Sequence, residues 1–420
     1  MRRILLLFAL IVPALPGASL GQEVPPECLC CREHLTGDMF GMRPCLAEHG
    51  ILADLQLTQF YQGVAGGGHE QTFQYGGKLD YEFTFVGEKL GLWKGFTAMM
   101  HAETRFGEDV NREAGVLAFP NTNMLWPYPE EHLTSISGLF LMQALNERVA
   151  LTAGKFNGID LFNMLYPNNG RGIDGFMNLS FLLPPTLFRT TGLSINAAGI
   201  LGMKGQQIQS ALLVYDTHSS STTVAPNLFD QGAVVLGYHR FFTDIGGLPG
   251  SHGFLGNYSN RTYTSTDPLD WTILPGEGLA AGQQTGSWTL AYFLDQMLWV
   301  DCCNEKRNVR LFSVWSLADG NPNPYHWSGN VQLQGSGLIR GRESDTMGVG
   351  YFYDGLSSDF KQLVSALPTV DLEDVQGVEL YYNAALTPWF HLTADLQIVD
   401  NQNVADDTAI ILGLRANVDL

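Results

Sequence analysis

Charged side chains are scarce in this 420-residue chain, at 15% of all residues, and acidic ones outnumber basic ones. The formal net charge of −19 makes the chain a poor binder of polyanions, which argues against nucleic acid as a partner. After Val12, no apolar run approaches the roughly 20 residues that a membrane-spanning helix needs. If the chain lies in a membrane, it must therefore cross as a closed β-barrel, because lipid offers no partner for unpaired backbone groups.

Several signatures of enzymes are also missing. The sequence contains no H-E-x-x-H pair, no Walker loop and no dinucleotide fingerprint. We therefore expect no catalytic residues, no metal centre and no cofactor, and we predict that the protein is not an enzyme. An outer-membrane lipid hydrolase is an alternative within the same fold, and it would need a serine and a histidine that converge at the outer face.

The first residues have the order of a secretory signal peptide. Arg2 and Arg3 precede the apolar residues 4–12, and small residues follow up to Gly21. We predict that residues 1–21 are removed on export, with cleavage after Gly21. A retained N-terminal anchor is the alternative, although the apolar run is well short of a spanning helix.

The remaining chain divides into a Cys-rich segment, residues 22–50, and a predicted barrel, residues 51–420. An exported chain with an even number of cysteines usually forms disulfides. We expect bridges within the Cys-rich segment or from it to a second pair, and zinc bound by four thiolates is the alternative. The six cysteines are Cys28, Cys30, Cys31, Cys45, Cys302 and Cys303.

Alternation of apolar and polar residues is the main signal for the fold. Residues 78–85 and 96–106 place apolar side chains at alternate positions, with charged or polar ones between them. Three further runs follow within residues 379–387, 391–398 and 410–420. A period of two sends alternate side chains to lipid and to the lumen of a barrel. Weaker runs lie at residues 53–60, 149–154, 193–197, 234–238, 310–317 and 347–353.

A secreted β-sandwich or β-helix also alternates apolar and polar residues. Two observations favour an outer-membrane barrel: the alternation continues to the last residue, and aromatic residues such as Phe85, Phe106 and Trp389 stand at the ends of runs. The predicted fold is therefore an all-β, transmembrane antiparallel β-barrel. Its long extracellular or inward-folded loops are predicted at residues 107–131, 157–185 and 244–286.

Three passages resemble the carbohydrate-selective porin family. Near the predicted mature start, LTGDMFGMRPCLAEHGI (residues 35–51) is similar to the family's opening, with Met39 and Phe40 where Trp and Gly are usual. The passage FMNLSFLLPPTL (residues 176–187) follows in the family's order. The strongest match is GVELYYNAALTPWFHLTADLQIV (residues 377–399).

This resemblance implies one barrel of 16 strands in the outer membrane. Its function would be the passive diffusion of neutral sugars, from monosaccharides to small oligosaccharides. The expected partners are these sugars and outer-membrane lipid, and the chain would be a monomer or a homo-oligomer. The alternative is a secreted or surface carbohydrate-binding β-protein without a pore.

A sugar pore needs polar groups that replace water around the sugar hydroxyls at a constriction. Carboxylates accept hydrogen bonds and Lys or Arg donate them, whereas an aromatic ring can stack on the sugar. The alternative is that such residues are ordinary solvated charges of the barrel interior. The candidates for pore or sugar contact are His101, Glu103, Arg105, Lys155, Asp160, Arg171, Asp174 and Trp126.

Overall fold

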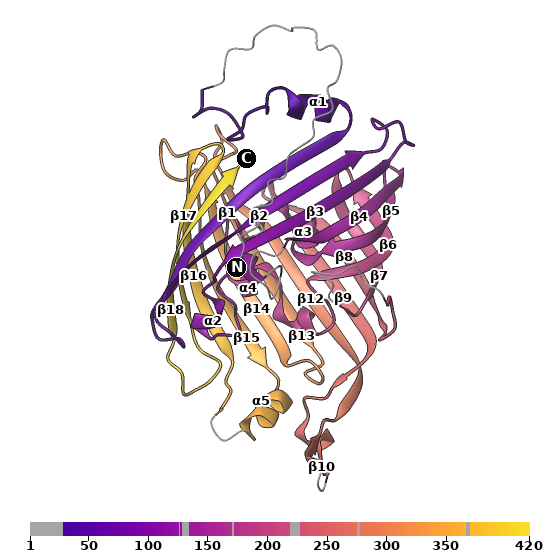
Figure 1. Cartoon of the computed structure of the whole chain (residues 1–420), viewed down its shortest axis with the longest axis vertical. Coiled ribbons are helices and arrows are strands. Elements are labelled where there is room, and N and C mark those ends of the chain that lie inside the picture. The colour runs from indigo at the N-terminus through magenta and orange to yellow at the C-terminus, as the bar shows by residue number, and fades with distance from the viewer. Residues whose placement is uncertain are drawn as a thin grey trace, which may run out of the picture.

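The computed structural model describes residues 28–125, 127, 134–169, 172–218, 227–274, 278–366 and 370–420. The predicted signal peptide, Trp126 and Arg171 lie outside these described residues. Within them, sixteen strands close into one antiparallel barrel (Figure 1). Both the predicted fold class and the predicted number of strands are confirmed.

Most of the described chain belongs to the barrel wall. The wall strands are β1 Ile51–Gly66, β2 Phe73–Val86, β3 Phe96–Gly107, β4 Thr134–Asn146, β5 Val149–Asn157, β6 Ser194–Lys204, β7 Gln207–Asp216, β8 Ala233–Ile245, β9 Leu248–Thr264, β12 Gln283–Val300, β13 Asn308–Ala318, β14 Tyr325–Ser336, β15 Thr346–Leu356, β16 Val375–Thr387, β17 Phe390–Val399 and β18 Ala409–Asp419. A separate two-stranded hairpin comprises β10 Thr272–Leu274 and β11 Gly278–Ala280.

The helices are short. They are α1 Met42–Glu48, α2 Asn111–Ala114, α3 Gly158–Leu165, α4 Leu179–Leu182 and α5 Ser358–Ser365, with single 3-10 turns η1 Asn123–Leu125, η2 Pro167–Asn169, η3 Pro185–Arg189 and η4 Pro268–Asp270. In the described part of the chain, no helix has the length and apolar character to cross a membrane.

The barrel closes where its first strand meets its last. β1 pairs with β18 in an antiparallel ladder, so that Leu57 lies opposite Val418. Arg43 of α1 reinforces this seam, because its guanidinium donates to the carbonyl of Ala53, at 2.9 Å, and to the carbonyl of Leu420. The Arg of the family-like opening therefore joins both strands of the closure.

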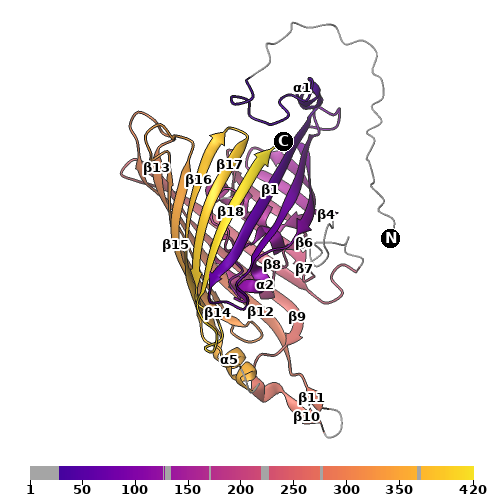
Figure 2. The ribbon, with the colours of Figure 1, turned by 60° about the vertical axis from the view of Figure 1, so that its left-hand side comes forward.

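The two ends of the barrel differ. The C-terminus and α1 lie at one end, while α5 and the β10–β11 hairpin extend from the other (Figure 2). Connections at the first end include two-residue turns at 147–148, 205–206, 246–247 and 388–389. The long connections between β3 and β4 and between β5 and β6 begin and end at the opposite end. Outer-membrane barrels have short periplasmic turns and longer extracellular loops, which makes the end with α1 periplasmic.

The prediction of a long loop at residues 244–286 is wrong, because β9 and the start of β12 occupy much of this range. Gly246 and Gly247, with φ of 65° and 82°, form a two-residue turn that leads directly into β9. Both φ values are positive, as the mirror-image hairpin turns require, and glycine adopts them without steric cost. The turn was missed because β9 is rich in Gly, Ser and Asn, which weakens its alternation.

Alternate residues of the wall face opposite environments. In β18, Ile410, Leu412 and Leu414 point outward and are 41%, 43% and 49% exposed, whereas Arg415 and Ile411 point inward and are fully buried. The apolar outer face suits lipid. Because the inner face is buried, another part of the chain must lie inside the barrel.

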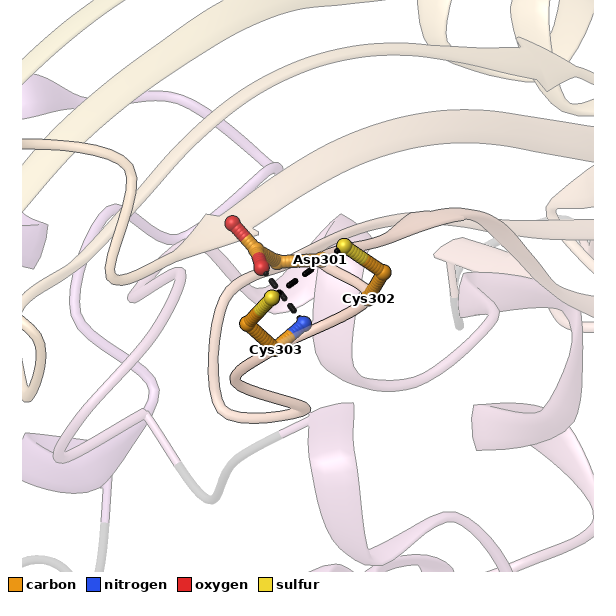
Figure 3. Close-up of side chains that lie close together, drawn as sticks. All are labelled: Asp301, Cys302 and Cys303. Carbon is orange, nitrogen blue, oxygen red and sulfur yellow. Dashed lines mark hydrogen bonds between the residues drawn. The ribbon is translucent and has the colours of Figure 1, made fainter.

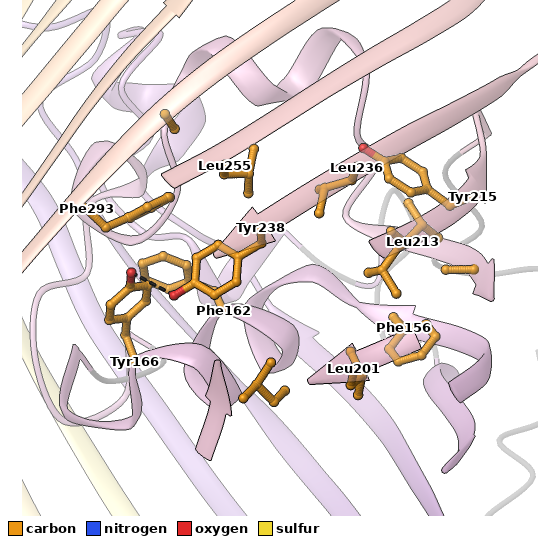
Figure 4. Packing of buried hydrophobic residues seen from close by; sticks show 14 of the residues in the cluster. Phe156, Phe162, Tyr166, Leu201, Leu213, Tyr215, Leu236, Tyr238, Leu255 and Phe293 are labelled. Carbon is orange, nitrogen blue, oxygen red and sulfur yellow. Dashed lines mark hydrogen bonds between the residues drawn. The ribbon is translucent and has the colours of Figure 1, made fainter. Parts of the chain in front are cut away.

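An aromatic cluster fills part of the interior (Figure 4). Phe162 and Tyr166, from the connection between β5 and β6, pack against Phe293 of β12, with ring centroids 6.0 and 5.3 Å apart. The hydroxyl of Tyr238 on β8 donates to that of Tyr166 at 2.9 Å. Apolar packing of this kind stabilises the connection against the wall, because buried aromatic rings contribute both area and ring contacts.

Candidate functional site

The described part of the connection between β5 and β6, residues 158–169 and 172–193, lies inside the barrel and is called the inward segment below. Its two ends meet, because the backbone N–H of Gly158 donates to the carbonyl of Leu193 at 2.7 Å. Asn157 and Asn178 cap the short helices α3 and α4 with their side-chain oxygens. Asn before each helix satisfies an N–H group that would otherwise lack a partner.

A buried cluster of charges joins α3 to the wall. The Lys78 ammonium on β2 lies 2.7 Å from Glu103 and 3.2 Å from Asp80. His101 of β3 lies 2.9 Å from Asp80 through Nε2 and 2.6 Å from Asp160 of α3 through Nδ1. Both ring nitrogens of His101 face carboxylates, so a protonated imidazole can donate a hydrogen bond to each of them. The cluster therefore ties the inward segment to β2 and β3 by charge-assisted hydrogen bonds.

The cluster does not have the free position that a metal ion would need. Ligand atoms of Asp80, His101 and Glu103 lie within 4.8 Å of one another, which is close enough for a shared cation. However, the ammonium of Lys78 already contacts both Asp80 and Glu103. The remaining space is about 10 Å³, which is room for one water molecule.

Arg105 and Lys155, two further candidates for pore contact, form bonds within the protein. The Arg105 guanidinium pairs with Asp109, just beyond the end of β3. Burial raises the pKa of Asp109, and the charge of Arg105 opposes this rise. Lys155 is buried and donates to the carbonyl of Ile136 on β4 at 2.6 Å.

Two other wall strands, β16 and β18, hold the inward segment by its backbone. Arg415 of β18 donates to the carbonyls of Gly172 and Gly175 at 2.7 and 3.0 Å. Glu379 of β16 accepts from the backbone N–H groups of residues 177–178 at 2.6 and 2.9 Å. A guanidinium therefore binds carbonyls and a carboxylate binds N–H groups, which fixes the segment to a second part of the wall, two to four strands from β2.

A third anchor combines charge with an aromatic face. Arg240 of β8 donates to the carbonyl of Leu165 at 2.7 Å, and its guanidinium lies 4.7 Å from the centre of the Tyr166 ring. Asp295 of β12 pairs with both Arg240 and Arg310. One carboxylate thus links an anchor of the segment to Arg310, which faces a cavity.

This cavity has a volume of about 290 Å³ and borders the inward segment. Its size is close to the lower end of small-molecule sites, at roughly 300 Å³. Asp174 of the segment and Arg310 of β13 contribute charges of opposite sign. Further polar groups come from Asn308, Gln334, Ser336, Thr346, Asn383 and His391.

The predicted contact residues therefore divide between two places. The structure brings His101, Glu103 and Asp160 together in the buried cluster, whereas Asp174 lines the cavity. The prediction omitted other charged residues of the inner face, although they occupy polar positions of strands. They include Lys78, Asp80, Arg240, Asp295, Arg310, Glu379 and Arg415.

A family model of carbohydrate-selective porins, the OprB family, matches residues 70–420. The chain belongs to the carbohydrate-selective porin family. This porin is a passive outer-membrane channel for sugars. The membership agrees with the closed 16-stranded wall, and it confirms the resemblance that the sequence carries.

Solved structures support the fold of this porin. A high pH structure of Pseudomonas putida OprB matches with a TM-score of 0.79 at 17% identity, covering 94% of this chain and 100% of that one. A low pH structure of the same protein matches at 0.57 and 14%, covering 93% and 99%. The outer membrane channel DcaP of Acinetobacter baumannii matches at 0.52 and 11%, covering 88% and 97%. No curated protein matches the sequence of the porin.

Proposed function

We propose that neutral sugars, from monosaccharides to small oligosaccharides, diffuse past the inward segment by way of the cavity between Asp174 and Arg310. The observation that carries this proposal is a polar space of about 290 Å³ with charges of both signs beside the segment. Sugar hydroxyls both donate and accept, so a carboxylate and a guanidinium together can replace their water shell. Amide groups of Asn308, Gln334 and Asn383 add donors and acceptors.

We also propose that this porin carries out no chemical reaction on its solute. Diffusion down a gradient needs no nucleophile and no acid–base pair. In the described part of the chain, the histidine of the buried cluster contacts two carboxylates, Asp80 and Asp160, through its two nitrogens. An imidazole held in this way has no free nitrogen with which to accept a proton from a solute.

The eight contact residues predicted from the sequence have separate proposed roles. His101, Glu103 and Asp160 are proposed to position the inward segment, since their side chains are mostly buried together where α3 meets the wall. Asp174 is proposed to contact sugar directly, because it lines the cavity. Sugar contact by Arg105, Lys155, Arg171 and Trp126 stays a prediction.

Current block by sugars in planar lipid bilayers tests the route. Added glucose and members of the maltose series should reduce single-channel conductance as their concentration rises. Replacing Arg310 with Gln should weaken this block roughly tenfold, the loss expected for one charged hydrogen bond of about 1.5 kcal/mol. Asp295 keeps Arg240 as its partner in this variant.

The exposed Arg340, in the turn between β14 and β15, gives a matched control. Arg340→Gln removes the same charge away from the cavity and should leave the sugar block unchanged. An unchanged block in Arg310→Gln, or bilayers that stay electrically silent with wild-type protein, would reject the proposed route.

We propose that the apolar outer face contacts outer-membrane lipid directly. Residues such as Leu290, Leu317 and Leu412 are about half exposed on this face. Extraction should therefore require detergent, and heated and unheated samples should migrate differently on gels. A protein that stays monodisperse in buffer without detergent would instead support the secreted carbohydrate-binding alternative.

A further inference from the structure

The turn between β12 and β13, residues 301–307, places two adjacent thiols beside a carboxylate. The Sγ atoms of Cys302 and Cys303 lie 3.4 Å apart. Ligand atoms of Asp301, Cys302 and Cys303 all lie within 4.8 Å of one another. Both thiols are exposed, and Figure 3 shows the three side chains gathered on one turn.

Hydrogen bonds within the turn hold the carboxylate in place. One oxygen of Asp301 accepts from the backbone N–H of Cys303 at 2.9 Å, and the other lies 2.7 Å from the Arg307 guanidinium. Arg307 in turn donates to the carbonyl of Gly337 at 3.0 Å. The first bond is among those drawn in Figure 3. Outer partners of this kind orient a ligand before an ion arrives.

We propose that Asp301, Cys302 and Cys303 bind one thiophilic divalent cation, Zn²⁺ or Cd²⁺, at the periplasmic end of the barrel. Two sulfurs bound to one tetrahedral zinc at about 2.3 Å stand about 3.8 Å apart. The observed separation of 3.4 Å therefore needs a shift of only about 0.4 Å to reach this geometry. With one carboxylate oxygen as third ligand, the fourth position is open to water.

The charges of the turn suit a divalent ion. Binding converts two thiols to thiolates and releases two protons to solvent, so the site supplies two sulfur charges and one carboxylate charge. The positive charge of Arg307 offsets one of these three negative charges. A divalent cation then neutralises the remaining two. Thiolate ligands also select zinc-like ions over Ca²⁺ and Mg²⁺, which prefer oxygen.

The buried cluster around His101 contrasts with this turn. There, the ammonium of Lys78 lies between the carboxylates of Asp80 and Glu103 and takes the place of a cation. At the turn, the Arg307 guanidinium binds one carboxylate oxygen of Asp301, and the backbone N–H of Cys303 donates to the other. The thiols therefore remain open to an ion from the periplasm.

Cadmium binding to the purified full chain in detergent, under anaerobic conditions, tests the proposal. A background variant with Cys28, Cys30, Cys31 and Cys45 all replaced by Ser removes every other thiol. This variant should bind one Cd²⁺ per chain by equilibrium dialysis, with ultraviolet absorption from thiolate-to-cadmium charge transfer. In the same background, Cys302→Ser should weaken binding by at least about 100-fold, the upper range for loss of an outer partner.

Asp301→Asn should weaken cadmium binding roughly tenfold, at the lower end of that range, while the charge-transfer absorption persists. Unchanged single-channel conductance and an unchanged heat shift on gels show that the variants fold. Equal cadmium affinity with and without Cys302 and Cys303 would overturn the proposal. Peptide maps of protein taken directly from membranes would also overturn it, if they show either thiol joined in a disulfide.

Discussion

The buried cluster on β2 and β3 and the cavity beside β13 use charge in opposite ways. In the cluster, Lys78 and His101 are surrounded by carboxylates, and the side chains of both are less than a tenth exposed. At the cavity, Asp174 is exposed, and Arg310 is partly exposed and has a carboxylate on one side only. Charged residues of both signs therefore hold the inward segment in one place and line a cavity in the other.

This difference shows that the type of charged residue does not identify a pore contact. A buried charge must be paired, because an unpaired one costs several kcal/mol, so its hydrogen bonds are already used within the protein. A charge at the edge of a cavity retains free bonding capacity. Anchors of the segment and the proposed contacts for sugar thus differ in burial.

The largest expected effect comes from breaking the cluster at its centre. Lys78→Met leaves Asp80 and Glu103 buried without their ammonium partner, which should cost about 3–5 kcal/mol of stability. Thermal unfolding in detergent, followed by the heat shift on gels, measures this loss. The control is Lys94→Met in the exposed turn before β3, which should unfold like wild type. Equal unfolding temperatures for the two variants would contradict the structural role of the cluster.

A smaller effect should follow from separating α3 from the wall. Asp160→Ala removes the 2.6 Å bond to His101 and should cost about 2 kcal/mol, as for a hydrogen bond to a charged group. A double-mutant cycle with His101→Ala isolates this pair. We expect a coupling energy of about 1–2 kcal/mol and larger conductance fluctuations in either single variant. A coupling energy near zero would mean that other contacts hold α3.

The smallest effect on stability is expected at the cavity. Asp174→Asn should change the free energy of unfolding by less than about 0.5 kcal/mol, since the residue is exposed. It should nevertheless reduce the preference for cations over anions, which the net charge of −19 leads us to expect. Reversal potentials in a salt gradient measure this preference. A large loss of stability without a change in selectivity would place Asp174 among the anchors.

Alternation predicted the wall well because each strand meets lipid on one side and polar groups on the other. The runs at residues 78–85 and 96–106 lie within β2 and β3, those at 379–387 and 391–398 lie within β16 and β17, and the last run lies within β18 except for Leu420. β9 was not predicted, because most side chains at its inward positions are small and the turn before it consists of only Gly246 and Gly247. The number of strands came from the family resemblance, not from the pattern.

The contacts of the interior were less predictable. The spacing of His101, Glu103 and Arg105 correctly predicts one inward face, but it does not reveal that α3 returns to cover part of that face. Partners such as Glu379 and the backbone at residues 177–178 are about 200 positions apart, and no local pattern joins them. Only the three-dimensional structure distinguishes the residues that anchor the inward segment from those that line the cavity.

The anchoring of the inward segment also limits how new channels can be engineered from this one. Its side chains and backbone groups form hydrogen bonds with four wall residues: His101 on β3, Arg240 on β8, Glu379 on β16 and Arg415 on β18. A foreign loop grafted between β5 and β6 would leave each of these four buried side chains without at least one of its hydrogen-bond partners. Successful chimeras must therefore transplant the wall residues together with the loop, as a single unit of design.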